Sequence, residues 1–137
     1  METQKAWVDE MLKQHRQAPY VFAVFHEPLF SAKASRLEDT AQRRAFWGDI
    51  FERNQVQVAF NGHDHHYHHA VHGGTHYVVT GGGGASLYEV DAPQPETVKA
   101  TKIEHYLRIE VGPEETKLTA IDIEGETIEE FEVPRRK

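Results

Sequence analysis

His63 and His65 stand two residues apart on a glycine-containing turn, a spacing that could place two imidazoles on one metal ion. The turn follows residues 56–60, whose β-branched and aromatic side chains predict a strand. Asn61-Gly62 ends that strand. Neutral imidazole is the commonest metal-binding side chain. Ligands of open α/β sheets bind beyond the carboxyl ends of the strands, so the pair predicts half of a metal site.

His26 is the third candidate ligand, because it directly follows another apolar run, residues 20–25, that predicts a buried strand. Residues 2–17 predict an amphipathic helix, and a second helix is predicted from Thr40 to about residue 51. Helix, strand, helix and strand in this order indicate a parallel βαβ unit, which brings the strand ends together. Three imidazoles can hold one zinc-like ion with a water, or be shared between two ions that carboxylates bridge.

The rest of the chain predicts short strands. A strand at residues 77–80 runs into four glycines, a proline-rich connection covers residues 91–96, and three strands joined by hairpin turns follow at about 106–111, 118–123 and 128–133. We therefore expect one α/β domain over residues 1–137. Residues 1–65 form its βαβ-type part and residues 66–137 its β-rich part.

Composition excludes several classes of function. Fifteen basic and 22 acidic residues give a net charge of −7, which argues against a nucleic-acid surface. The chain contains no cysteine, so disulfides and thiolate metal sites are excluded, and an imidazole-rich shell suits Fe, Mn or Zn. Without an export signal or an apolar span, the chain as given is expected to be cytoplasmic and not bound to a membrane.

The order of these motifs resembles the calcineurin-like metallophosphoesterases, and most of all their purple-acid-phosphatase-like branch. The resemblance rests on residues 24–30 around His26, the strand at 56–60, the Gly62-His63-Asp64-His65-His66-Tyr67 run and residues 78–84. It covers nearly the whole chain, from about Trp7 to about Val133.

The resemblance implies a sandwich of two sheets flanked by helices, with a dinuclear metal centre at the strand ends. His26 and His63 would bind one metal and His65 the other, and a metal-bound hydroxide would attack a phosphoester substrate. Two cations would lower the pKa of the water and stabilise an in-line displacement.

The chain departs from this pattern. The Asp and Asn motifs that family members carry upstream of the first helix here are missing, so the chain resembles a carboxyl-terminal half with half of the metal shell. Residues 31–39 contain no histidine, which leaves a general acid unassigned, and His68-His69 stand where the family often has arginine. We expect the chain alone to be inactive. The alternative is a non-catalytic histidine-rich metal-binding or interaction domain with this fold.

The remaining candidates have structural alternatives. Asp64 could orient a ligand or simply form a turn. His66, His68 and His69 are expected at the surface, with His66 the nearest to the site and Tyr67 a possible substrate-side group. Gly81, Gly82, Gly83 and Gly84 could approach a phosphate, although a tight turn beside the site is the favoured interpretation. Residues 135–137 are expected to form a loose tail.

Two predicted strands are apolar on both faces. In a half-sandwich one of these faces would lack its covering sheet, so we expect self-association or a missing amino-terminal half as the partner.

Overall fold

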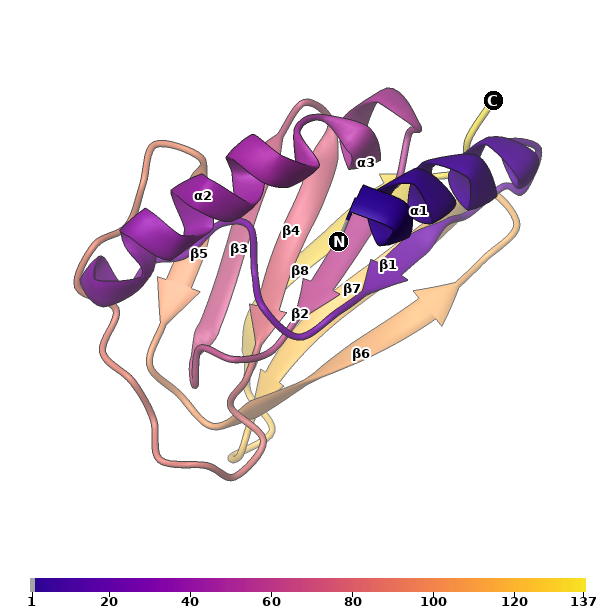
Figure 1. Cartoon of the computed structure of the whole chain (residues 1–137). Helices are drawn as coiled ribbons and strands as arrows, with labels where there is room; N and C mark the ends of the chain where they lie inside the picture. The colour runs from indigo at the N-terminus through magenta and orange to yellow at the C-terminus, as the bar shows by residue number, and fades with distance from the viewer. Residues whose placement is uncertain (1) are drawn as a thin grey trace.

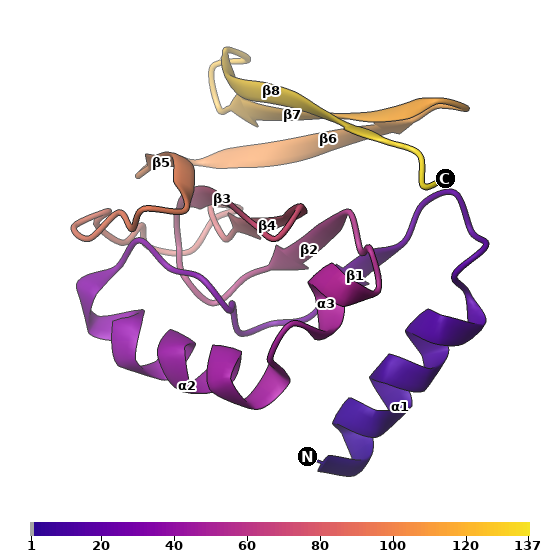
Figure 2. The same cartoon turned by 90° about the horizontal axis from the view of Figure 1, so that it is seen from above.

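The computed structural model describes residues 2–137, and this part of the chain forms three layers (Figures 1 and 2). The helical layer contains α1 (Glu2–Gln14), α2 (Leu37–Trp47) and α3 (Ile50–Arg53), with a 3₁₀ turn at Ala34–Arg36. The first sheet contains β1 (Phe22–Val24), β2 (Val58–Asn61), β3 (Tyr67–His72), β4 (Thr75–Thr80) and β5 (Thr97–Thr101). The second contains β6 (His105–Val111), β7 (Glu115–Asp122) and β8 (Thr127–Pro134). Figure 2 shows the helices on one face of the first sheet and the second sheet on the other.

The first sheet is mixed, and its parallel part positions the histidines. Its strand order is β1-β2-β4-β3-β5. β1 and β4 both pair in parallel with β2, whereas β3 pairs antiparallel with β4 and β5. The predicted βαβ unit is therefore present, and the carboxyl ends of β1, β2 and β4 lie at one edge. The strand β5 was not predicted.

The second predicted helix is two helices. α2 starts at Leu37, and Thr40 lies inside it, with its hydroxyl donating to the Leu37 carbonyl at 3.0 Å. Gly48 ends α2 with a φ of 62°, a left-handed value that glycine adopts without steric cost. The expectation of one continuous helix from Thr40 to residue 51 was wrong, because the chain turns at this glycine. None of the helices within residues 2–137 is long and apolar enough to cross a membrane.

Both faces of β2 are covered within this chain. Ala59 packs with Ile50 and Phe51 on the helical side, while Val58 packs with Leu118 of β7 on the other side. The expectation that this strand lacks its covering sheet was wrong, because β6, β7 and β8 supply that sheet. Of the two strands predicted to be apolar on both faces, the edge strand β1 is the more exposed, with Val24 81 % exposed.

Arg136 fastens the carboxyl terminus to the helical layer. Its guanidinium donates to the carbonyls of His15 at 2.6 Å, Ala18 at 2.9 Å and Asn54 at 3.0 Å. These carbonyls follow α1 and α3, where helix ends leave backbone acceptors without partners. The expectation of a loose tail was therefore wrong for Arg136, which is only 9 % exposed.

Replacing Arg136 by alanine is expected to lower the free energy of unfolding by about 2–4 kcal/mol, because three partly buried carbonyls lose a charged donor. Urea denaturation followed by circular dichroism would measure the change. Arg135→Ala is the matched control, since Arg135 is exposed and donates to one carbonyl, that of Pro113, at 3.3 Å. Equal losses for the two variants would contradict this role for Arg136.

Candidate metal centre

The loops after β1 and β2 bring His26 and His63 together. The parallel pairing continues past both strands, since the Gly62 amide donates to the His26 carbonyl at 3.0 Å. His63 then adopts a φ of 69°, an unusual left-handed value for a residue other than glycine. The two rings lie with centroids 5.2 Å apart at an interplanar angle of 78°. Their adjacency is what the strand order predicted.

The His65 side chain contacts a different segment of the chain, residues 86–88. Its Nδ1 is 2.9 Å from the Ser86 carbonyl oxygen, and its ring stacks on Tyr88 with centroids 4.1 Å apart. Among residues 2–137, no three His, Asp or Glu side chains converge as a metal-binding group. The structure thus places two of the three predicted ligands together, and the assignment of His65 stays a prediction.

The electrostatics of the pair favour neutral imidazole. Burial and the positive charge of Arg36 lower the pKa of His63, so its ring is unprotonated at neutral pH and has a free lone pair. The same charge of Arg36 opposes the approach of a bare cation. His26 and His63 therefore fit part of a ligand shell, and a complete shell needs further, negatively charged ligands.

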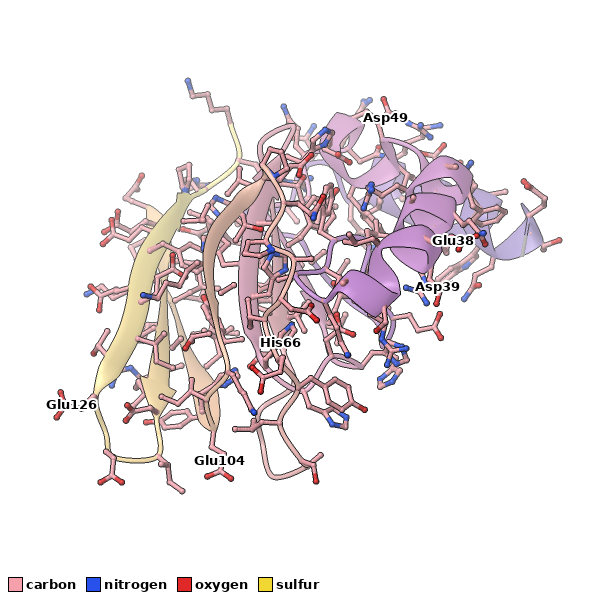
Figure 3. The ribbon with its side chains drawn as sticks, turned by 90° about the vertical axis from the view of Figure 1, so that its left-hand side faces the viewer. Glu38, Asp39, Asp49, His66, Glu104 and Glu126 are labelled. Carbon is pink, nitrogen blue, oxygen red and sulfur yellow. The ribbon has the colours of Figure 1, made fainter. Side chains whose placement is uncertain are left out.

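Two other carboxylates, those of Glu27 and Asp49, form ion pairs with arginines. Glu27 forms an ion pair with Arg43 at 3.0 Å. Asp49, the aspartate of a Gly-Asp pair, bonds Arg53 at 2.8 Å and lies on the helical layer, far from the labelled His66 in Figure 3. Asp49 is therefore not placed to bridge two ions at the strand ends.

Asp64 is a buried connector between loops. Its Oδ2 accepts a hydrogen bond from the Ser31 hydroxyl at 2.6 Å, and its Oδ1 accepts one from Arg36 Nε at 3.2 Å. The side chain is fully buried. Asp64 therefore ties the loop after β1 to the loop after β2, a role that sequence reasoning missed because the partners lie 33 and 28 residues away.

His66, His68 and His69 are buried, so the expectation of a surface position was wrong for all three. Their exposed fractions are 0 %, 1 % and 2 %, and Figure 3 shows His66 in the interior. Both ring nitrogens of His66 are buried. His68 Nε2 lies 2.9 Å from the hydroxyl oxygen of Thr97, which belongs to the unpredicted strand β5.

Tyr67 points between the two sheets. Its hydroxyl donates to Glu129 Oε2 of β8 at 2.6 Å, and the side chain is fully buried. Its ring also lies edge-to-face against His105, with centroids 5.3 Å apart. This placement supports the packing of the two sheets, and the hydroxyl is engaged by Glu129 of the second sheet.

The glycine run follows β4 and passes close to the loop that carries Asp64. A Cβ on Gly81 would lie 2.1 Å from the Asp64 carbonyl oxygen, and one on Gly82 would lie 2.4 Å from His105 Nδ1. Gly83 and Gly84 meet no such contact. The first two glycines therefore allow close approach of the backbone to the loop of Asp64 and to His105.

Comparisons with known proteins show the fold. No protein-family model and no curated protein sequence matches this chain. GAP50, the anchor in the inner membrane complex of Plasmodium, matches 99 % of this chain with 43 % of its own length, at a TM-score of 0.87 and 15 % identity. Purple acid phosphatase PPD1 from yellow lupin (Lupinus luteus) seeds matches 96 % with 28 % of its length, at a TM-score of 0.78 and 18 % identity.

These two matches confirm the expected fold class, a mixed sheet and an antiparallel sheet that form part of a metallophosphoesterase-like sandwich. Within residues 2–137 the helices cover only the outer face of the first sheet (Figure 2). The chain spans less than half the length of either protein. At this level of identity the similarity concerns fold and not activity.

Gly81→Ala is expected to lower the free energy of unfolding by about 2–3 kcal/mol, because the new methyl group overlaps the Asp64 carbonyl and the loop must shift. Gly83→Ala is the matched control and should change stability by less than about 0.5 kcal/mol. Thermal and urea denaturation would measure both. A harmless Gly81→Ala would show that this contact is not required.

Stability is expected to fall as the pH drops from about 6.5 to about 4. Burial lowers the pKa of five histidines. In this pH range the unfolded chain therefore binds more protons than the folded chain. The five histidines are His63, His66, His68, His76 and His105. Burial lowers the pKa of His68 to about 4, which is worth roughly 3 kcal/mol at neutral pH.

Urea denaturation at a series of pH values would test this linkage. His68→Asn should flatten the dependence of stability on pH by up to one proton, whereas the exposed His15→Asn should leave it unchanged. A flat profile between pH 7 and pH 4 would contradict the prediction.

Proposed function

We propose that this chain is the carboxyl-terminal half of a metal-dependent phosphoesterase catalytic domain. The observation that carries the proposal is the pair of His26 and His63 at the ends of adjacent parallel strands, 5.2 Å apart between ring centroids. The pair lies within a fold that matches part of a purple acid phosphatase. The motif order around His26, His63 and His65 supports the same assignment.

The residues of this chain would hold and assist one part of the centre. His26 and His63 would bind one ion of Fe, Mn or Zn through neutral imidazole nitrogens, and His65 would serve the second ion of the family site. A bound metal would supply a Lewis acid and an activated water for hydrolysis of the phosphoester. Arg36 is 25 % exposed beside His63, where it would attract the anionic substrate while Asp64 fixes its orientation.

Completion of the centre requires carboxylates from outside these residues. Among residues 2–137, β1 pairs only with β2, so it is an edge strand of the first sheet, and His26 directly follows it. Further strands added at this edge would end beside His26, where they could contribute bridging ligands. We propose the missing amino-terminal half as their source, with self-association of this chain as the alternative.

A second candidate function is a non-catalytic binding domain. It is favoured by the match to GAP50, an anchor protein, over 99 % of this chain at a TM-score of 0.87. Asp64 and Glu27 also favour this function. Each already pairs with another side chain, so within residues 2–137 His26 and His63 have no carboxylate that bridges two metal ions. In this case the chain would bind one ion or a partner without turnover.

Titration of the chain with Zn²⁺ or Mn²⁺ in a calorimeter tests the proposal. We expect one ion to bind, with affinity reduced by about tenfold or more in His26→Ala and in His63→Ala because each removes a ligand. His15→Ala is the control, since His15 lies just after α1 and is exposed. Absent binding, or binding that neither variant weakens, would overturn the metal site.

Separate measurements distinguish the two candidate functions, and also the two possible partners, a missing amino-terminal half and a second copy of this chain. We expect the chain alone not to hydrolyse p-nitrophenyl phosphate with either metal. The DNA upstream of Met1 separates the two functions. If it encodes the missing aspartate motifs in frame, the chain is half of a phosphoesterase. If it does not, the binding domain is favoured. Light scattering on the same sample would show whether the chain self-associates.

A further inference from the structure

A row of polar side chains crosses the interior between the two sheets, and the candidate metal centre does not use it. Glu129 of β8 accepts hydrogen bonds from the Tyr67 hydroxyl at 2.6 Å and from His69 Nδ1, which is 3.0 Å from both carboxylate oxygens. On its other side, His69 Nε2 lies 2.7 Å from Nδ1 of His76 on β4. Phe131 stacks on both imidazoles, with centroids 4.0 Å and 5.0 Å away.

The hydrogen-bond partners assign the protons of this row. Burial raises the pKa of Glu129, but the hydrogen bonds from His69 and Tyr67 outweigh it, so that the pKa lies below its usual value and the carboxylate is ionised at neutral pH. An ionised carboxylate only accepts, so His69 must donate from Nδ1. In neutral His69, Nε2 is then an acceptor, which requires His76 to donate from its own Nδ1.

The outer end of the row reaches a cavity. His76 is partly exposed and lines a cavity of about 430 Å³ beside the β3–β4 turn and residues 133–137. Because Nδ1 of His76 is bonded to His69, the nitrogen that meets this water-accessible space is Nε2. A proton from this cavity therefore enters the row through His76.

We propose that Glu129, His69 and His76 form a proton relay that takes up one proton from the cavity and turns the hydrogen bond between neutral His69 and the Glu129 carboxylate into an ion pair between the sheets. The incoming proton binds His76 Nε2, and the proton on His76 Nδ1 passes to His69 Nε2. The products are neutral His76, now protonated at Nε2, and a His69 imidazolium beside the Glu129 carboxylate. No hydrogen bond is lost, because His69 Nε2 then donates to His76 Nδ1.

Neighbouring charges limit the relay to one proton. The charged and titratable groups around the row are Lys99 on β5, His68 on the opposite face of β3, and Glu52, Arg135, Arg136 and Lys137 at the cavity. Burial, together with a charge on His69, lowers the pKa of His76 to about 4. A second proton would place two imidazoliums at hydrogen-bond distance and break the contact.

Histidine-selective ¹⁵N NMR of the full chain, titrated from pH 8 downwards, tests the relay. At pH 8 both rings should carry their proton on Nδ1. On acidification, His69 should become an imidazolium and His76 should switch to the Nε2–H form with the same midpoint. Separate midpoints, or an imidazolium on His76 while His69 stays neutral, would overturn the proposal.

Variants assign the source of the proton affinity. Glu129→Gln removes the charge that stabilises the His69 imidazolium, so the midpoint should fall by about one pH unit or more, a tenfold loss of proton affinity. His72→Gln is the matched control, because His72 pairs with Glu52 at 2.7 Å at the exposed end of β3. The control should leave the midpoint unchanged. If Glu129→Gln does not fold, the coupled titration of the natural chain still decides the outcome.

Discussion

The buried carboxylate of Asp64 is the interaction on which the candidate centre depends. It accepts hydrogen bonds from Ser31 and Arg36, which belong to the segment after β1. Its neighbours in the sequence are His63 and His65. Its carbonyl oxygen also faces Gly81 at the end of β4, at a distance that tolerates no side chain. One residue therefore fixes the loops of three neighbouring parallel strands. A buried carboxylate needs hydrogen-bond partners to be stable, so Ser31 and Arg36 support the loop that carries His63.

The parts of the fold that follow from local pattern could be predicted. The apolar runs before His26 and His63, separated by a helical segment, specify a parallel pair, and the adjacency of these two histidines follows from it. The burial of His66, His68 and His69 could not be predicted in the same way. A histidine-rich segment between turns has the composition of a surface, and the groups that cover it, such as Glu129, lie about 60 residues later in the chain.

The same limit explains the errors about Arg136 and about the faces of β2. Arg136 bonds carbonyls up to 121 residues away, so no local pattern marks it as buried. β2 is apolar on both faces because two different layers cover it. The second of these layers comes from the last third of the sequence. Local periodicity shows that a face is buried. It does not show which element buries it.

Histidine gives this fold a polar side chain that can be buried neutral, and this distinguishes it from arginine or lysine. The pair of His26 and His63, proposed to bind a metal, and the row between the sheets both use that property, but they respond to protons in opposite ways. His63 must stay unprotonated to offer its lone pair, and the nearby charge of Arg36 helps to keep it so. His69 instead lies against Glu129, where an added proton gains a partner. Because the two sites respond differently to protons, acid should empty a metal centre at the strand ends while the contact between the sheets persists.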